Sequence, residues 1–230
     1  MKFAKLFTVT ACIVLSSYAS AERELPNFEL SLGGGTAIGA ELFNIDFTVN
    51  IPVLEYFSAQ INLDSNYIFG DNVYGDFALS EFNGLGFVRV SEGRVGLGFG
   101  TLQKKSRSGA FETQQKPVTH LLASYYAEDV TIDWRYSSYS DTFEKFTSVK
   151  AGVIWYPDSN RRIGLYRERF DNREGWRLET FIQPEKYRQH LAVGALIRDG
   201  GSDILPYMGL ELRYYFDRGL GTKARDRGYH

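Results

Sequence analysis

Hydrophobic and polar residues alternate along most of this chain. In residues 43–51 every second position is Phe, Ile or Val, and the positions between them are Asn, Asp or Thr. The same alternation recurs in residues 57–64, 130–137 and, less strictly, 207–216. A period of two places successive side chains on opposite faces of a β-strand. The pattern therefore predicts long strands, each with one apolar and one polar face.

Applied to the whole chain, this pattern predicts twelve strands and no long helix. We expect the strands near residues 26–37, 40–51, 56–69, 76–90, 94–103, 116–126, 130–139, 146–156, 162–170, 175–183, 189–198 and 204–216. Short connections such as Ser-Glu-Gly-Arg at 91–94 follow the even strands, whereas most others are longer and polar. Short turns at one end and longer loops at the other are typical of outer-membrane barrels.

The predicted fold is therefore all-β: an antiparallel transmembrane β-barrel of twelve strands, with eight or ten strands as alternatives. A secreted β-sandwich or lipocalin-like barrel would also show alternation, with its polar face outside. The strands here are long, and aromatic residues gather at segment ends, for example at Trp155 and Tyr156. Aromatic girdles of this kind mark the membrane interfaces and favour the membrane barrel.

Residues 1–21 have the composition of a secretory signal peptide. Lys2 and Lys5 precede an apolar run, and small residues at Ala19 and Ala21 predict cleavage after Ala21. The apolar run is shorter than the roughly 20 residues that a membrane-spanning helix needs. Val9-Thr10-Ala11-Cys12 offers an alternative, a lipoprotein box with Cys12 lipidated. The expected organisation is a signal peptide at 1–21, a barrel at 22–216 and a basic C-terminal tail at 217–230.

Composition excludes several other classes of protein. After loss of the leader, 24 basic residues face 28 acidic ones, so the chain lacks the basic excess of a nucleic-acid-binding protein. Cys12 is the only cysteine and lies in the leader, so the mature chain has neither a disulfide nor a thiolate metal site. We expect no metal and no cofactor.

Together these features give a resemblance to the small Gram-negative outer-membrane β-barrel proteins, as a broad class. It rests on the leader ending Ala19-Ser20-Ala21, the alternating segments of 26–216, and the last strand 209–216 with its terminal aromatic Phe216. Such an aromatic is similar to the signal that barrel-assembly machinery recognises, which implies that machinery as a partner and the bacterial outer membrane as the location. The chain departs from the class because fourteen residues follow Phe216; we expect them to extend into the periplasm.

With the apolar face toward lipid, the polar face lines the lumen. The charge candidates there are Asp46, Asp64, Asp133, Arg135, Lys150, Arg177, Glu179, Arg198, Glu211 and Arg213, with Glu29 and Glu168 beside them. Opposite charges two residues apart lie about 6.5 to 7 Å apart along a strand, so Asp133/Arg135, Arg177/Glu179 and Glu211/Arg213 are within reach of each other. In strand number the chain resembles the small acidic-sugar porins, but their strongly basic lumen is replaced here by one of mixed sign.

The sequence offers little for catalysis. A lipid-modifying barrel enzyme would use Ser and His, and His120 with Ser124 is the nearest pair on one strand face. Four residues along a strand separate them by about 13 Å, far beyond the roughly 3 Å of a nucleophile and its base. A Ser from another strand could still approach His120. We interpret His120 as a girdle or rim residue and the chain as a non-enzyme.

Two further motifs need an interpretation. The segment 103–116, expected to be mostly a loop, carries four bases, Lys104, Lys105, Arg107 and Lys116, that could bind lipopolysaccharide phosphates. The GxGxG at 96–100 is set in an alternating run and more simply thins the inner face of a strand than binds a nucleotide. The function that fits best is a narrow, weakly selective passive pore for small solutes. The alternative is a structural or adhesive surface barrel; a lipid-modifying enzyme ranks below both.

Overall fold

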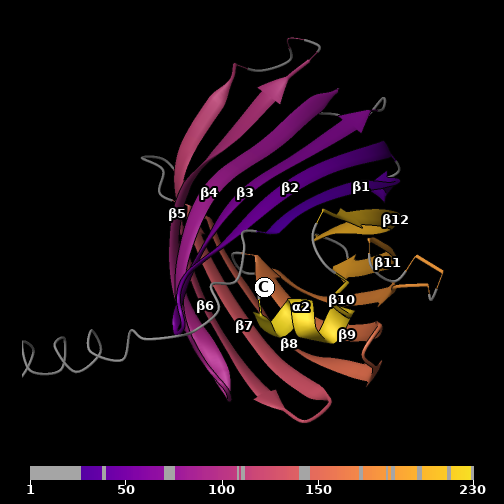
Figure 1. Ribbon diagram of the computed structural model, residues 1–230. Helices are drawn as coiled ribbons and strands as arrows, with labels where there is room; N and C mark the ends of the chain where they lie inside the picture. Colours follow the sequence, from indigo (N-terminus) through magenta and orange to yellow (C-terminus); the bar gives the residue numbers. More distant parts are fainter. Residues whose placement is uncertain are drawn as a thin grey trace, which may run out of the picture.

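The twelve strands close into one antiparallel β-barrel in the computed structural model (Figure 1). The structure describes residues 27–37, 40–69, 76–107, 109, 112–139, 146–170, 173–184, 186–187, 190–200, 204–216 and 219–228. The leader and its cleavage site lie outside these residues.

Each strand pairs with its neighbours in sequence, and β1 pairs with β12 over nine residue positions to close the ring. The strands are β1 (Asn27–Ala37), β2 (Ala40–Leu54), β3 (Phe57–Phe69), β4 (Phe77–Val90), β5 (Gly93–Ser106), β6 (Gln114–Ala127), β7 (Val130–Tyr139), β8 (Phe146–Asp158), β9 (Arg161–Phe170), β10 (Arg173–Ile182), β11 (Leu191–Gly200) and β12 (Ile204–Tyr215). The predicted fold class and strand number are confirmed, and the alternatives of eight or ten strands are wrong.

The strand ends define two ends of the barrel. At the turn end, two residues connect β2 to β3, β4 to β5, β6 to β7 and β8 to β9. Two of the connections expected from the sequence are wrong. The link from β10 to β11, expected as a tight turn, runs from 183 to 190, and the expected polar loop after β9 is only two residues, because β10 already begins at Arg173.

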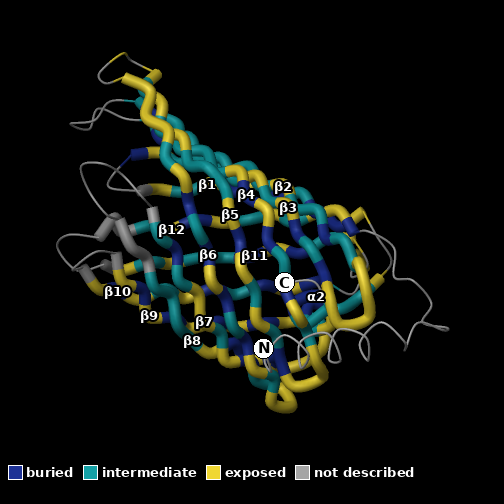
Figure 2. Tube along the Cα trace, turned by 90° about the vertical axis from the view of Figure 1, so that its left-hand side faces the viewer, coloured by how far each residue is buried: buried dark blue, intermediate teal, exposed yellow. Residues whose placement is uncertain are grey.

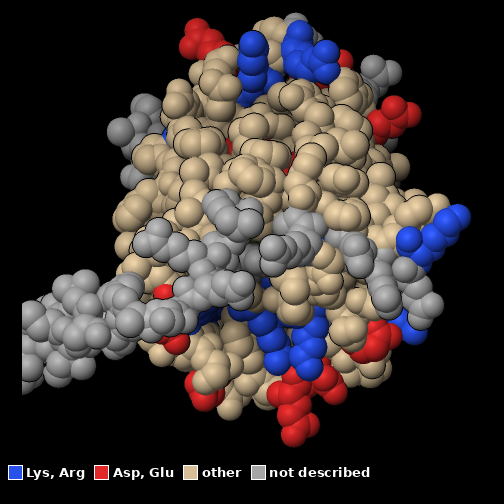
Figure 3. Space-filling model, viewed as in Figure 1, with Lys and Arg blue, Asp and Glu red and all other residues tan. Residues whose placement is uncertain are grey.

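The outer surface of the barrel is apolar. Large hydrophobic side chains at every second position are exposed, among them Phe47, Ile61, Leu97, Ile132 and Leu210. Exposed and buried positions alternate along β9, and Figure 2 shows the two kinds interleaved over the barrel wall. In Figure 3 most of the visible surface over the strands is uncharged, with charged atoms mainly toward its margins and where α2 lies. An apolar belt around a closed sheet is the arrangement that satisfies every backbone group inside lipid.

The sequence suggested that the chain after Phe216 extends away from the barrel. The structure instead packs part of it against the barrel. Residues 222–228 form a short helix, α2 (Thr222–Gly228), at the turn end of the barrel (Figure 1). Arg225 is 1% exposed and Thr222 2% exposed, so this helix is packed against the barrel. Within the described residues, no helix is long and apolar enough to cross a membrane.

The facing of the strands can be tested with two neighbouring residues of β3. Ile61 is 39% exposed on the outer face, whereas the Asn62 side chain donates to Asn83 inside the barrel. We expect Ile61→Arg to impair insertion, because a cation on the lipid face near the midplane costs about 2 to 4 kcal/mol. Asn62→Arg should be tolerated. The measurement is the fraction of protein that migrates faster on a gel when unboiled. Equal behaviour of the two variants would mean that the inner and outer faces are assigned wrongly.

Candidate functional site: the barrel interior

Glycines on the inner wall leave room for large side chains of the neighbouring strands. A Cβ added at Gly96 would lie 2.8 Å from Phe87 Cβ, and one at Gly100 would lie 2.5 Å from Asn83 Cβ. At Gly98 an added Cβ would collide with Leu85. The glycine motif of β5 therefore thins the inner face of the strand, as the sequence predicts. Tyr166 and Phe181 cover other inner glycines in the same way, and these side chains narrow the interior.

A ladder of amides and carboxylates lines the inner face of β1 to β4. Asn50 donates to Glu29 at 3.3 Å and accepts from Gln60 at 2.7 Å, and Asn62 donates to Asn83 at 2.9 Å. Asp46 accepts from Asn44 at 2.9 Å and Asp64 from Asn66 at 2.5 Å. The two carboxylates therefore receive neutral amide donors, and the described residues give neither of them a salt bridge.

Arginines dominate the inner face of β9 to β12, and glutamates neutralise them. Arg177 forms ion pairs with Glu179 at 2.5 Å and Glu168 at 3.6 Å, and Arg198 forms an ion pair with Glu168 at 2.6 Å. Arg213 contacts Glu211 at 2.8 Å. Two of the three pairs expected along single strands are therefore present. The third is absent, because Asp133 accepts instead from the Ser124 hydroxyl at 2.8 Å.

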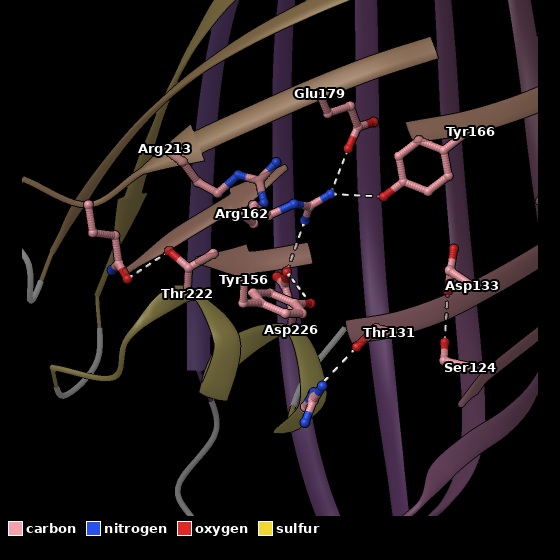
Figure 4. A network of polar contacts seen from close by, with 12 residues as sticks. Ser124, Thr131, Asp133, Tyr156, Arg162, Tyr166, Glu179, Arg213, Thr222 and Asp226 are labelled. Carbon is pink, nitrogen blue, oxygen red and sulfur yellow. Dashed lines mark hydrogen bonds and ion pairs between the residues drawn. The ribbon is translucent and has the colours of Figure 1, made fainter. Parts of the chain in front are cut away.

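Arg162 is a key residue of this wall that the sequence analysis missed. Its guanidinium donates to Glu179 at 2.6 Å, to the Tyr166 hydroxyl at 3.1 Å and to Asp226 of α2 at 3.2 Å (Figure 4). Alternation provides a signal for it, since Arg162 lies on the same face of β9 as Glu168. No sequence pattern brings Asp226 to it, because that contact depends on the path of the tail.

The helix α2 is held at the turn end by polar contacts with many strands. Asp226 accepts from the Tyr156 hydroxyl at 2.9 Å, and Thr222 donates to Gln183 at 2.9 Å. Arg227 donates to Val130 O at 2.9 Å, and Arg89 of β4 donates to Gly228 O. The contacts of the helix therefore extend from β4 to the residue that follows β10, and the helix narrows the opening of the barrel at its turn end.

An exposed ion pair adds to this attachment. Lys223 Nζ lies 2.7 Å from Asp129 in the turn between β6 and β7. The hydrogen bond and the positive charge of Lys223 lower the pKa of the Asp129 carboxyl. A depressed folded-state pKa means that this contribution is present at neutral pH and is lost only as the pH falls through the lowered value.

His120 lies inside the barrel, so the interpretation as a girdle or rim residue is wrong. It is 6% exposed, its Nδ1 is 2.8 Å from Ser137 Oγ, and its Nε2 is 2.7 Å from Glu81. The Ser from another strand, which the sequence left open, is therefore Ser137. This chain of hydrogen bonds has the residue types of a nucleophile, base and acid. These hydrogen bonds link side chains of β4, β6 and β7 across the inner face of the barrel.

The four bases proposed for lipopolysaccharide do not share one surface. Lys104, Lys105 and Lys116 lie on strands β5 and β6 rather than in a loop. The Lys104 ammonium is 5.0 Å from the Phe77 ring centroid, and Phe77 is buried on the inner wall. Lys116 lies on the inner face of β6, four residues before His120. Lys105 points the other way, and Arg107 lies 5.1 Å over the Phe69 ring. Only Lys105 and Arg107 remain on the outer side for such a contact.

Metal chemistry finds no support in the described part of the chain. No group of three or more His, Cys, Asp or Glu side chains with the arrangement of a metal site occurs among these residues.

Comparison with known proteins agrees with the fold. No protein-family model matches the chain, and none of the curated proteins matches it. Among solved structures, it is similar to the KdgM porin at 10% identity and a TM-score of 0.62, covering 82% of this chain and 99% of the porin. The KdgM porin in complex with disordered oligogalacturonate gives a TM-score of 0.61 at 10% identity, with the same coverage. Similarity at this level of identity establishes the outer-membrane barrel fold and nothing further.

The attachment of α2 can be tested by trypsin, which cleaves after Lys and Arg residues of this helix. Tyr156→Phe removes the hydroxyl that donates a hydrogen bond to Asp226. A hydrogen bond to a charged group contributes about 1.5 to 3 kcal/mol. We expect the C-terminal fragment to be released roughly tenfold faster or more, because cleavage follows the population of the undocked helix.

Asp129→Asn provides the matched control. It weakens the exposed contact with Lys223, which solvent screens, and should change the cleavage rate little. If Tyr156→Phe leaves the rate unchanged while the unboiled gel shift persists, the helix does not dock as described.

Proposed function

We propose that this protein is a narrow, weakly selective passive pore for small polar solutes. The observation that carries the proposal is that the inner wall of the twelve-stranded barrel is polar and reached by water. Arg135 is exposed although it lies on the inner face of β7, and Asp46 and Asp64 are only partly buried. A barrel of eight strands is just filled by its side chains, whereas larger barrels leave room for water.

The narrowness of the proposed pore follows from what projects into it. Phe87, Tyr166 and Phe181 lie over inner glycines, and the ion-paired arginines fill much of the β9 to β12 side. At the turn end, α2 reduces the opening further. These features support passage of small solutes and a low conductance.

Weak selectivity between cations and anions is supported by the balance of charges. The arginines of the β9 to β12 side are paired with Glu168, Glu179 and Glu211. Such pairing cancels the field that would concentrate ions of one sign. We further propose that the pore performs no catalysis.

The proposal includes location and partners. The protein is exported by residues 1–21, cleaved after Ala21 and inserted in the bacterial outer membrane with its turn end in the periplasm. Barrel-assembly machinery recognises the last strand and Phe216. Lys105 and Arg107 contact lipopolysaccharide at the other end of the barrel.

A structural or adhesive surface barrel is the second candidate. It is favoured by the docking of α2 at the mouth, which would close a barrel whose task is to present its outer loops. Conductance separates the two candidates, because a closed barrel passes no ions.

The experiment is single-channel recording of the full-length protein and of a variant that lacks residues 217–230. We expect a small conductance and a nearly symmetric ion preference for the full chain. The truncated barrel should still assemble, because β1 and β12 close the ring without α2. It should conduct more, because α2 no longer narrows the opening at the turn end. The unboiled gel shift serves as a check that the truncated chain still assembles. Silence of both proteins in a bilayer, with the shift retained, would reject the pore and favour the structural barrel.

A further inference from the structure

Two pairs of like charges face each other directly across neighbouring strands. Asp46 on β2 and Asp64 on β3 are register partners, and so are Arg135 on β7 and Lys150 on β8. Like charges at directly opposed positions of a sheet destabilise it. Both couples lie in the middle part of their strands and on the inner face of the barrel.

Neither couple is neutralised by ion pairs in the described part of the chain. Asp46 and Asp64 accept hydrogen bonds from Asn44 and Asn66, and Lys150 lies 4.4 Å over the Tyr166 ring. Arg135 forms no salt bridge among these residues and is exposed to water in the interior.

Another register couple of like charge shows the contrast. Arg177 and Arg198 are also partners, on β10 and β11, and Glu168 lies 3.6 Å from one and 2.6 Å from the other. That couple shares ion pairs with Glu168, whereas the described residues give the Asp46/Asp64 and Arg135/Lys150 couples no salt bridge. Glu168 of β9 is also the register partner of Lys150.

The acidic couple and the basic couple lie on different walls. In the ring of twelve strands β2 is six strands from β8, so β2 and β3 lie across the barrel from β7 and β8 (Figure 1). Glu81 on β4 adds to the acidic side and contacts His120. Asp133 lies two residues from Arg135, but the Ser124 hydroxyl joins it to Arg94 at the turn end.

We infer that these couples set up a transverse electric field that favours small zwitterionic solutes, with Asp46 and Asp64 toward the cationic group and Arg135 and Lys150 toward the anionic group. This inference rests on the proposed pore function and names its substrate class. Because the two couples are of opposite sign and face each other across the interior, they orient a dipole along the line that joins them. A narrow lumen with low-dielectric walls strengthens such a field.

The test compares two isomers of equal composition, glycine and the uncharged glycolamide. Full-length protein in liposomes should admit glycine faster than glycolamide, after subtraction of the leak through protein-free liposomes, by a factor of about ten. Replacing all four residues, with Asp46→Asn, Asp64→Asn, Arg135→Gln and Lys150→Gln, should bring the ratio close to that expected from size alone.

Variants of one couple provide a second readout. Asp46→Asn with Asp64→Asn should shift the reversal potential toward anion preference, and Arg135→Gln with Lys150→Gln toward cation preference. Arg135→Lys keeps the charge and should keep the glycine preference. The unboiled gel shift shows that each variant is folded.

The outcomes separate this inference from the pore proposal. If both isomers enter at equal rates through the full-length protein, the transverse field is rejected and the pore stands. If neither isomer enters, the pore is rejected and the inference falls with it. Unchanged reversal potentials in both double variants would also overturn the inference.

Discussion

Closure of the sheet between β1 and β12 is the constraint on which the rest of the structure depends. In hydrocarbon each unsatisfied backbone N–H or C=O costs several kcal/mol, so a strand assembly can cross a membrane only as a ring without edges. The nine-position pairing of β1 with β12 completes that ring. Once the ring is closed, alternation leaves no choice for the side chains: one set meets lipid, and the other set must find partners or water inside. The polar interior is therefore a consequence of the same closure that makes the outside apolar.

Inside the ring, charged side chains are held by partners on the same or neighbouring strands, because a charge withdrawn from water is costly without such partners. On β9 to β12 this is done by ion pairs, with Glu168 and Glu179 each serving two arginines. On β1 to β4 amides take that part, and they stabilise carboxylates through hydrogen bonds without cancelling their charge. The two walls therefore hold their charged side chains differently, by ion pairs on β9 to β12 and by amide hydrogen bonds on β1 to β4.

Much of this fold could be predicted from the sequence, and what was missed has a common cause. Strand limits agree closely because a period of two, interrupted by polar turns, is a local signal, and β7 begins and ends where it was predicted. The inner face follows from the same alternation. The contact of His120 with Ser137 and Glu81 depends on the register of the four strands β4 to β7, which local patterns do not specify. The docking of α2 depends on Arg162 and Tyr156, more than sixty residues away, and the seven residues of the helix contain no apolar stripe to announce it.

Arg162 connects the wall of the barrel to its mouth. One guanidinium nitrogen contacts Glu179 and Tyr166, whose ring lies over Gly164, and the other contacts Asp226 of α2. A buried guanidinium cannot lose its proton and is costly to leave without carboxylate partners, so the position of α2 and the arrangement of the arginine wall are energetically linked. Displacing the helix would leave Glu179 as the carboxylate partner of Arg162, and Arg177 binds the same carboxylate. The packing of side chains on the β9 to β12 side and the position of α2 at the turn end therefore depend on one shared set of charges.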